Sequence, residues 1–227
     1  MNIASEDTIA GQAVYSKKML SVYDLWVLGV SNSLIWKCRT KNILRWLNQS
    51  LTANHLDVGV GTGYYLDRCS FPTSKIRLGL LDLNPNSLEA TAHRVNRYTP
   101  EVYQSDILQP LPEQLQRFDS VSLNYLLHCL PGDLISKAVL FDHLESWLNP
   151  GAIISGSTIL HAGVPRGLSA RRLMQFYNQK QIFSNTFDSL DELQSQLTSR
   201  YTDVEINVIG CVALFRALYN PTPSNIE

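Results

Sequence analysis

The sequence lacks any surplus of charge and any cluster of basic residues. Its 227 residues include 19 lysines and arginines and 20 aspartates and glutamates, which gives a formal net charge of −1. Proteins that bind a nucleic-acid backbone or an anionic membrane concentrate positive charge, because neutralising the phosphates supplies much of the affinity. The composition therefore argues against nucleic acid and membrane as main partners of this chain.

Long apolar runs and paired cysteines are also scarce. The most apolar segment, WVLGVSNSLIW at 26–36, is too short to span a bilayer and is interrupted by polar residues. The first 20 residues carry early acidic side chains and no apolar core, so they are unlike a signal peptide. Two disulfides could form in principle, but the scattered cysteines without a CxxC pair favour free thiols: Cys38, Cys69, Cys129 and Cys211. We therefore expect a soluble protein of a reducing compartment, the cytoplasm.

A regular alternation of strand and helix patterns occupies the middle of the chain. Between residue 55 and about residue 160, short apolar runs typical of buried strands alternate with segments of helical spacing. This alternation predicts parallel strands joined by right-handed crossovers, with helices on both faces of the sheet. The strands are expected at 54–60, 76–84, 101–107, 118–124 and 152–160, and 203–219 reads as one long strand or two paired strands.

Helical patterns fill the intervening segments and the N-terminal part of the chain. They cover 39–51, 87–99 with Asn86 or Ser87 as N-cap, 134–149, 171–183, and 188–201 with Asp188 or Ser189 as N-cap. With no internal repeat and no low-complexity segment, the simplest organisation is one domain over 1–227. Its expected parts are a helical cap (1–50), an α/β core (51–220) and a short tail (221–227).

Three glycines in five residues follow the first expected strand, in the stretch HLDVGVGTGYY. Gly59, Gly61 and Gly63 lie just after Asp57, at the edge of an open α/β sheet where ligands bind. Glycines there let the backbone approach a ligand without an intervening Cβ. A dinucleotide fingerprint would need a further glycine at Tyr64, and a P-loop would need a following Lys-Ser or Lys-Thr pair. A tight turn with no ligand is the alternative, but it would leave Asp57 without a role.

The pattern D-V-G-V-G-T-G resembles motif I of the class I S-adenosylmethionine-dependent methyltransferases. Later segments follow that family's order: LLDLNP, whose Asp82 lies 19 residues after Gly63, then QSDIL, FDSV and LNPGA. Ala152 stands where the family usually has a second glycine. The resemblance spans residues 55 to about 160. It implies an α/β, Rossmann-like, doubly wound, mainly parallel seven-stranded sheet with an antiparallel C-terminal strand, helices on both faces and a helical N-terminal cap.

The resemblance also implies the cofactor, S-adenosyl-L-methionine, with S-adenosyl-L-homocysteine as product. Asp82 is expected to accept both ribose hydroxyls through charge-assisted hydrogen bonds, and Asp57 to face the methionine ammonium. Asp106 is expected to reach the adenine amino group. The expected cofactor-binding set is completed by Leu83 and Ile107 against the adenine ring, Asn124 beneath the sulfonium, the glycines Gly59, Gly61 and Gly63, and Tyr15 (with Tyr23) over the methionine end.

Two histidines follow strands on the expected ligand side. His128 comes after the fourth strand and His161 after the fifth, and either could act as a general base near neutral pH, although methyl transfer does not always need one. Packing or capping is the competing interpretation for both. The expected acceptor pocket is apolar and aromatic: Tyr23, Trp26, Trp36, His128, His161, Met174, Phe176 and Tyr177.

The sequence lacks the motifs of two related classes of methyltransferase. No carboxylate follows the fifth strand, as a magnesium-dependent enzyme of this family would require, so no metal is expected, and the N-P-P-[YFW] motif of nucleic-acid enzymes is missing. The resemblance therefore favours metal-independent, in-line methylation of a small, partly apolar molecule of specialised metabolism. O-, N- and C-methylation stay open, as does a monomer or a homodimer. The alternatives are a non-methylating step such as cyclisation, a non-catalytic partner subunit, and a protein methyltransferase, which would need an acidic groove.

Overall fold

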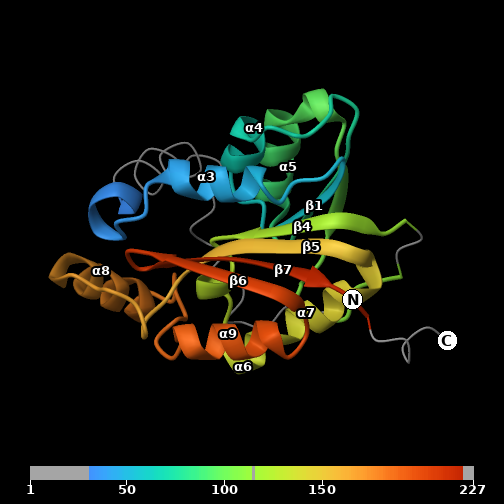
Figure 1. Cartoon of the computed structure of the whole chain (residues 1–227). Coiled ribbons are helices and arrows are strands. Elements are labelled where there is room, and N and C mark those ends of the chain that lie inside the picture. The colour runs from blue at the N-terminus through green and yellow to red at the C-terminus, as the bar shows by residue number, and fades with distance from the viewer. Residues whose placement is uncertain (1–30, 114–115, 222–227) are drawn as a thin grey trace.

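A seven-stranded sheet forms the centre of the computed structural model, which describes residues 31–113 and 116–221. The strand order is β3-β2-β1-β4-β5-β7-β6 (Figure 1). Strands β1 to β5 are parallel and β7 runs antiparallel between β5 and β6. The strands are β1 (Asn54–Val58), β2 (Arg77–Asp82), β3 (Glu101–Gln104), β4 (Phe118–Asn124), β5 (Leu148–Ile159), β6 (Thr202–Ile209) and β7 (Val212–Tyr219). The predicted fold class is confirmed.

Strand order reverses between β1 and β4. From β1 the chain builds outward through β2 and β3, and it then returns to add β4 on the other side of β1. The loops after β1 and β4 therefore diverge to opposite faces of the sheet and leave a crevice at the carboxyl ends of these strands. The glycine-rich turn 59–63 opens into this crevice.

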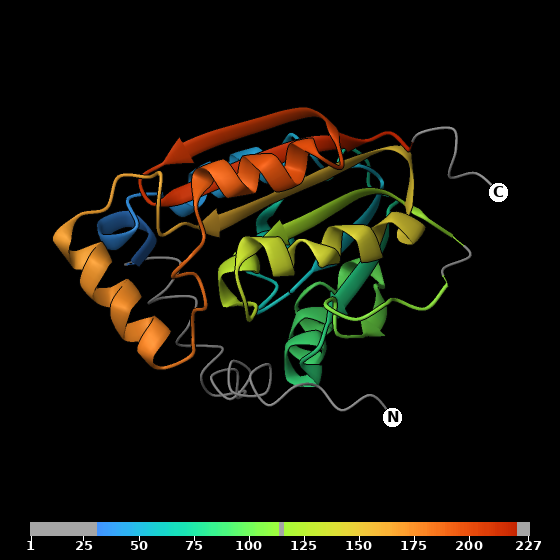
Figure 2. The ribbon, with the colours of Figure 1, turned by 90° about the horizontal axis from the view of Figure 1, so that it is seen from below.

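Helices cover both faces of the sheet (Figures 1 and 2). On one face lie α3 (Thr40–Asn48), α4 (Tyr64–Arg68) and α5 (Pro85–Arg94); on the other lie α6 (Leu134–Lys137), α7 (Val139–Leu144) and α9 (Leu190–Thr198). Helix α8 (Leu168–Gln179) extends beyond one end of the strands. Buried side chains of α7 and α9, such as Phe141 and Leu193, belong to one apolar cluster with Val121 and Phe215 of the sheet. The indole of Trp46 donates to Phe215 O at 2.9 Å and thereby fixes α3 on the opposite face.

One of the two predicted helix caps is wrong and the other is confirmed. Asn84, rather than Asn86 or Ser87, caps α5, because Pro85 takes the first helical position and the Asn84 side chain accepts from Asn86 N. Ser189, one of the two candidates predicted for α9, caps this helix: its side chain accepts a hydrogen bond from Glu192 N. The carboxylate of the other candidate, Asp188, instead forms a buried ion pair with Lys137.

The predicted helix over 134–149 is wrong as one continuous element. It is divided at Ala138 into α6 and α7, and a 3₁₀ turn, η4 (Glu145–Trp147), leads into β5. The break adjoins Lys137, which is fully buried; its Nζ lies 2.7 Å from Asp188 Oδ2 and 2.5 Å from Ser184 O. An amphipathic pattern assumes that a lysine is exposed, and this lysine instead binds the segment that precedes α9.

The segment 203–219 folds as the two paired strands β6 and β7. They turn at Gly210, whose φ is 59°. A Cβ added to Gly210 would lie 2.1 Å from Trp36 O, so only glycine fits at this turn. Two further 3₁₀ turns follow α5 and β4: η2 (Asn96–Tyr98) and η3 (Leu127–Cys129). The expectations for the cap before residue 31 and for the tail after residue 221 lie outside the described residues. Over the part that is described, no helix has the length and apolar character to cross a membrane.

Candidate functional site

The glycine-rich turn after β1 adopts a backbone that side chains disfavour. Gly59, Gly61 and Gly63 have φ of 73°, 54° and 71°, in the left-handed region. A Cβ on Gly63 would lie 2.8 Å from Thr91 Cγ2, so packing against α5 excludes it, whereas a Cβ on Gly61 would meet no atom within 4 Å. Gly61 therefore keeps space open above the turn that no residue of the described part of the chain fills.

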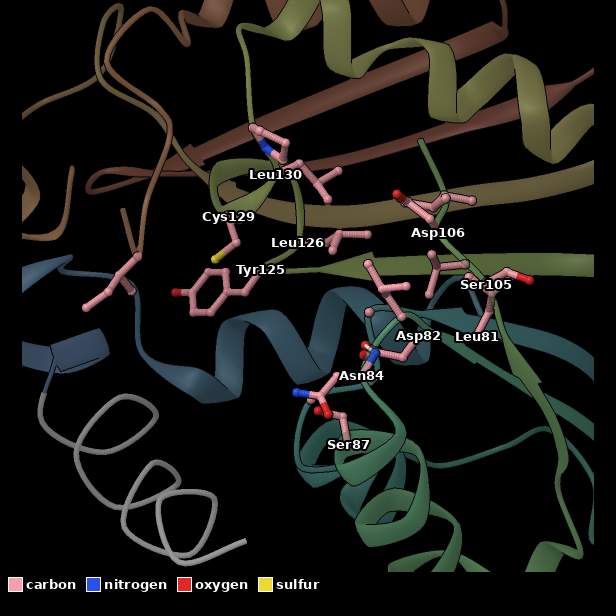
Figure 3. A pocket seen from close by; sticks show the side chains of 17 residues that line it. Leu81, Asp82, Asn84, Ser87, Ser105, Asp106, Tyr125, Leu126, Cys129 and Leu130 are labelled. Carbon is pink, nitrogen blue, oxygen red and sulfur yellow. Dashed lines mark hydrogen bonds between the residues drawn. The ribbon is translucent and has the colours of Figure 1, made fainter. Parts of the chain in front are cut away.

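Two adjoining cavities share this turn. The Asp82 cavity, lined among others by Asp82, Leu83, Asp106, Ile107 and Leu126, lies between the ends of β2, β3 and β4 (Figure 3). The Asp57 cavity is lined among others by Asp57, Gly63, Tyr64 and Asn124. Both include Gly59, Gly61 and Tyr125, so together they form one continuous crevice at the point where strand order reverses.

The structure brings together all the described residues that the sequence assigned to cofactor binding. Each lines at least one of the two cavities: Asp57, Gly59, Gly61, Gly63, Asp82, Leu83, Asp106, Ile107 and Asn124. Tyr15 lies outside the described residues.

Asp82 stands at the end of β2 and faces the crevice. Its Oδ1 accepts from Asn84 N at 2.8 Å. Burial raises the pKa of Asp82 to about 6, although backbone N–H groups, including those of Asn84 and Gly61, counteract this. The side chain is therefore mainly a carboxylate at neutral pH and is suited to accept hydrogen bonds from a vicinal diol.

Asp57 is almost completely buried, with 7% of its surface exposed. The Ser122 hydroxyl donates to its Oδ1. Burial raises the pKa of Asp57 to about 7; the Ser122 hydrogen bond opposes this rise and the charge of Asp82 adds to it. A cationic ligand group in the Asp57 cavity would offset the burial of this charge.

Two further polar side chains show what the crevice offers. Asp106 Oδ1 accepts from Leu108 N at 3.0 Å, so part of this carboxylate stabilises the turn after β3. Asn124 is oriented by Ser157 Oγ, which donates to Asn124 Oδ1 at 3.1 Å. Its Nδ2 is buried and has no hydrogen-bond partner among the residues that the structure describes. A buried donor of this kind indicates a ligand acceptor in the Asp57 cavity.

Comparison with known proteins identifies the ligand class. A family model described as a methyltransferase domain matches residues 56–154. The chain is 38% identical over 216 residues to demethylluteothin O-methyltransferase of Streptomyces thioluteus, a match that covers 95% of this chain and 94% of that protein. Physcion biosynthesis cluster O-methyltransferase of Aspergillus chevalieri is 36% identical over 213 residues, covering 93% and 96%. The chain belongs to the class I S-adenosylmethionine-dependent methyltransferases.

A solved structure described as a DhpI-SAH complex shares this methyltransferase fold. Its TM-score is 0.68 at 17% identity, over 96% of this chain and 100% of that one. The cofactor of the methyltransferase is S-adenosylmethionine, and the crevice fits it. A carboxylate lines each cavity, and Gly61 leaves room where the cavities meet. Asn124 Nδ2 is a buried donor with no acceptor among the described residues.

His128 of the methyltransferase is packed away from both cavities. It is 2% exposed, and its ring lies 4.5 Å from that of Phe183 and 5.3 Å from that of Tyr125. Nδ1 accepts from Ile159 N at 3.3 Å, and burial, helped by the charge of Lys137, lowers the pKa of His128 to about 3. The η3 turn directs this side chain into the core, so the geometry favours the packing interpretation over the catalytic one.

His161 is only partly buried, just beyond β5. Its backbone N donates to Asp188 O at 2.9 Å, and its ring Nδ1 is buried without a hydrogen-bond partner in the described part of the chain. Burial and the nearby charge of Arg166 lower the pKa of His161 below its ordinary value. The ring is therefore neutral at pH 7 and can accept a proton.

Four of the residues predicted for the acceptor pocket do not line either cavity. Trp36 and Met174 are buried in a core cluster, Tyr177 packs on Phe183, and Phe176 is 49% exposed; none of these four lines either cavity. Tyr23 and Trp26 lie outside the described residues.

Part of the apolar wall of the Asp82 cavity comes from side chains that the sequence analysis did not assign to the site. They follow β4 or precede α9: Tyr125, Leu126, Cys129, Leu130 and Ile182 (Figure 3). Tyr125 has a left-handed backbone, with φ of 58°, and its hydroxyl donates to Asn32 Oδ1 at 2.8 Å. Except for Ile182, these residues lie in the segment directly after β4, and that position is the sequence signal that marks them.

Replacement of Gly61 by alanine tests the space above the turn. We expect S-adenosylhomocysteine to bind about tenfold more weakly, because the added methyl group enters the crevice and overpacking of this kind costs about 1–3 kcal/mol. Isothermal titration calorimetry measures this change. Gly151→Ala is the matched control, since Gly151 also has a positive φ (82°) and open space around it but lies outside both cavities. Equal loss of affinity in both variants would contradict the assignment.

Proposed function

We propose that this methyltransferase transfers the methyl group of S-adenosylmethionine to a hydroxyl group of a small, partly apolar molecule of specialised metabolism, without a metal ion. The observation that carries the proposal is the match to demethylluteothin O-methyltransferase over nearly the full length of both chains. The apolar wall formed by Tyr125, Leu126 and Ile182 supports an acceptor with apolar surface.

The crevice residues divide the cofactor between them in this proposal. Asp82 binds the ribose hydroxyls, and Asp57 binds the ammonium of the amino-acid end. Asp106 binds the adenine amino group, while Leu83 and Ile107 pack on the ring. Asn124 donates its buried amide N–H to the amino-acid end, beneath the sulfonium. When bound, the cofactor supplies a methyl group already activated by a positively charged sulfur, so the protein has only to align the acceptor and remove its proton.

His161 is the proposed general base. Its ring is neutral at pH 7, and the strand that it follows, β5, pairs with β4, the strand that carries Asn124 to the crevice. His128 is assigned to packing, because it is buried against Phe183 and Tyr125. We further propose a cytoplasmic monomer or homodimer; the four cysteines, all free thiols, support a reducing compartment.

The proposal is tested by product analysis with purified protein. The protein is incubated with S-adenosylmethionine and a panel of small phenols, enols and matched amines, and S-adenosylhomocysteine release and product mass are followed. We expect products that gain one methyl group on oxygen. Methylation of the amines alone would overturn the oxygen assignment. Conversion of an acceptor without S-adenosylhomocysteine would support a non-methylating step, and absence of cofactor binding would support a partner subunit.

Cofactor affinity should fall as the pH is lowered through 7. Asp57 binds an ammonium only as a carboxylate, and its pKa in the cofactor-free protein is about 7. Such a group is about nine-tenths ionised at pH 8 and about one-tenth ionised at pH 6, so the Kd of S-adenosylhomocysteine should rise about tenfold between them. Calorimetry across this range measures the profile. The Asp57→Asn variant should retain only the smaller dependence due to Asp82, whose pKa is about 6; a flat profile in the unmodified protein would contradict the assignment.

A further inference from the structure

A column of polar side chains runs between β1 and β4, behind the Asp57 cavity. The parallel register pairs His55 with Ser120 and Asp57 with Ser122, and residues two apart on a strand share a face, so all four side chains lie on one side of the sheet. His55 is completely buried, as are Ser120 and Ser122. Polar groups this deep in a sheet are costly unless each finds a partner.

Hydrogen bonds connect the column in sequence. His55 Nδ1 lies 2.8 Å from Ser120 Oγ and Nε2 lies 3.0 Å from Ser122 Oγ. Ser122 Oγ in turn donates to Asp57 Oδ1. At the far end, Ser120 Oγ accepts from Thr52 N at 3.1 Å and shares a hydrogen bond of 2.8 Å with Thr52 Oγ1, in which Thr52 is the donor when Ser120 donates to the imidazole. The imidazole therefore joins the Asp57 carboxylate to the amino end of β1 through two hydroxyl groups.

The single proton of each hydroxyl fixes the direction of the whole chain. When Asp57 is ionised, the Ser122 proton points to the carboxylate, and Ser122 Oγ can then only accept from the imidazole. His55 must carry its proton on Nε2, and Nδ1 accepts from Ser120. With the proton on Nδ1 instead, Nε2 would take the Ser122 proton, and only a protonated Asp57 could keep its contact with Ser122.

We propose that His55 is a positioning residue for cofactor capture: held as the Nε2–H tautomer, it orients the Ser122 hydroxyl toward Asp57 and so maintains an ionised, fixed acceptor for the ammonium of S-adenosylmethionine. The inference rests on the proposed role of Asp57. It assigns a function in the site to a histidine that does not line either cavity.

The surroundings of the column indicate that His55 acts on Asp57 through a relay of hydrogen bonds, by way of Ser122, and not through a charge of its own. Phe71 packs its edge on the imidazole, with ring centroids 6.0 Å apart, and burial lowers the pKa of His55 to about 3, so the ring stays neutral. The groups that act on Asp57 are Ser122 and Asp82, and neither carries a positive charge. Stabilisation of the carboxylate before the cofactor binds therefore depends on the Ser122 hydrogen bond.

The test compares two ligands that differ at the amino-acid end. S-adenosylhomocysteine carries the ammonium, whereas 5′-methylthioadenosine shares the nucleoside and lacks the amino-acid part. Calorimetry at pH 8 gives the affinity ratio of the two ligands for each variant. We expect Ser122→Ala to lower this ratio about tenfold, the size of one hydrogen bond to a charged group. His55→Asn, which cannot place a donor at Ser122, should lower it about threefold, and His55→Gln, whose longer side chain places an amide near the Nε2 position, should restore most of the ratio.

Ser155→Ala is the matched control. Ser155 pairs with Ser122 on the neighbouring strand and is equally buried, but its hydroxyl donates to Val121 O rather than to Asp57. The control should leave the ratio unchanged, and binding of 5′-methylthioadenosine shows that each variant is folded. Nitrogen-15 NMR of the complex with S-adenosylhomocysteine should report the Nε2–H tautomer for His55.

The outcomes distinguish the relay through His55 and Ser122 from the assignment of Asp57 to the ammonium. If Asp57→Asn lowers the ratio while the Ser122 and His55 variants do not, the relay is overturned and the ammonium assignment stands. If Asp57→Asn leaves the ratio unchanged, both are overturned. An Nδ1–H tautomer, or an equal effect of Ser155→Ala, would also overturn the relay, because His55 would then only fill and satisfy the core.

Discussion

Replacement of Asp82 by alanine is expected to weaken S-adenosylhomocysteine binding by about a hundredfold or more. A carboxylate that accepts two hydroxyl groups makes two charge-assisted hydrogen bonds of about 1.5–3 kcal/mol each, and both are lost together. The fold should persist, because the charge of Asp82 is itself disfavoured by burial, as its raised pKa shows. The internal contacts that are lost are hydrogen bonds from backbone N–H groups, including those of Asn84 and Gly61. Calorimetry gives the affinity and thermal unfolding the stability.

Two further variants make this result specific. Asp82→Asn keeps an oxygen for Asn84 N but loses the charge, so its affinity should lie between those of the wild type and the alanine variant. Asp119→Ala removes an exposed carboxylate from the amino end of β4, where it accepts from Asn54 and Asn149, and should leave affinity unchanged. Unchanged affinity in Asp82→Ala would refute the ribose assignment.

The cofactor site could be predicted from the sequence because it depends on strand ends. Asp57, Asp82 and Asn124 each stand at or next to the last residue of a parallel strand, and parallel strands bring their carboxyl ends to one edge. The alternating pattern located those ends within a few residues. The side chains of Asp57, Asp82 and Asn124 all line the crevice, as their positions at these strand ends predict.

The acceptor side required information that local pattern does not contain. His128 occupies the right loop, but the η3 turn sends its ring into the core and leaves Leu126, Cys129 and Leu130 to line the cavity. The division of the helix at Ala138 depends on the pair Lys137–Asp188, whose members are 51 residues apart. Both features arise from tertiary packing, which overrides the periodicity of a short segment.

The same limit applies to the column behind Asp57. His55 lies at the amino end of β1, away from the edge of the sheet where ligands bind, so its position in the sequence gives it no role in the site. Only the register with β4 shows that it stands one hydroxyl group away from Asp57.

Replacement of His161 by glutamine is expected to lower kcat for a hydroxyl acceptor by about a hundredfold or more, the usual contribution of a general base. Cofactor affinity should not change, because His161 does not line either of the two cavities assigned to S-adenosylmethionine. The deficit should shrink at high pH or with an acidic phenol as acceptor, since an acceptor that ionises by itself no longer needs the base. Initial rates of S-adenosylhomocysteine release across pH, with acceptors of different acidity, measure both effects.

His128→Gln is the matched control for this experiment, because it makes the same change in a buried histidine. Loss of the contacts with Phe183 and Tyr125 should lower the free energy of unfolding by about 1–3 kcal/mol, with kcat of the folded fraction preserved. A large loss of kcat in His128→Gln with full stability would reverse the two assignments. A loss in His161→Gln that is independent of pH and of acceptor acidity would instead assign His161 to acceptor positioning, because a positioning contact is needed whether or not the acceptor is ionised.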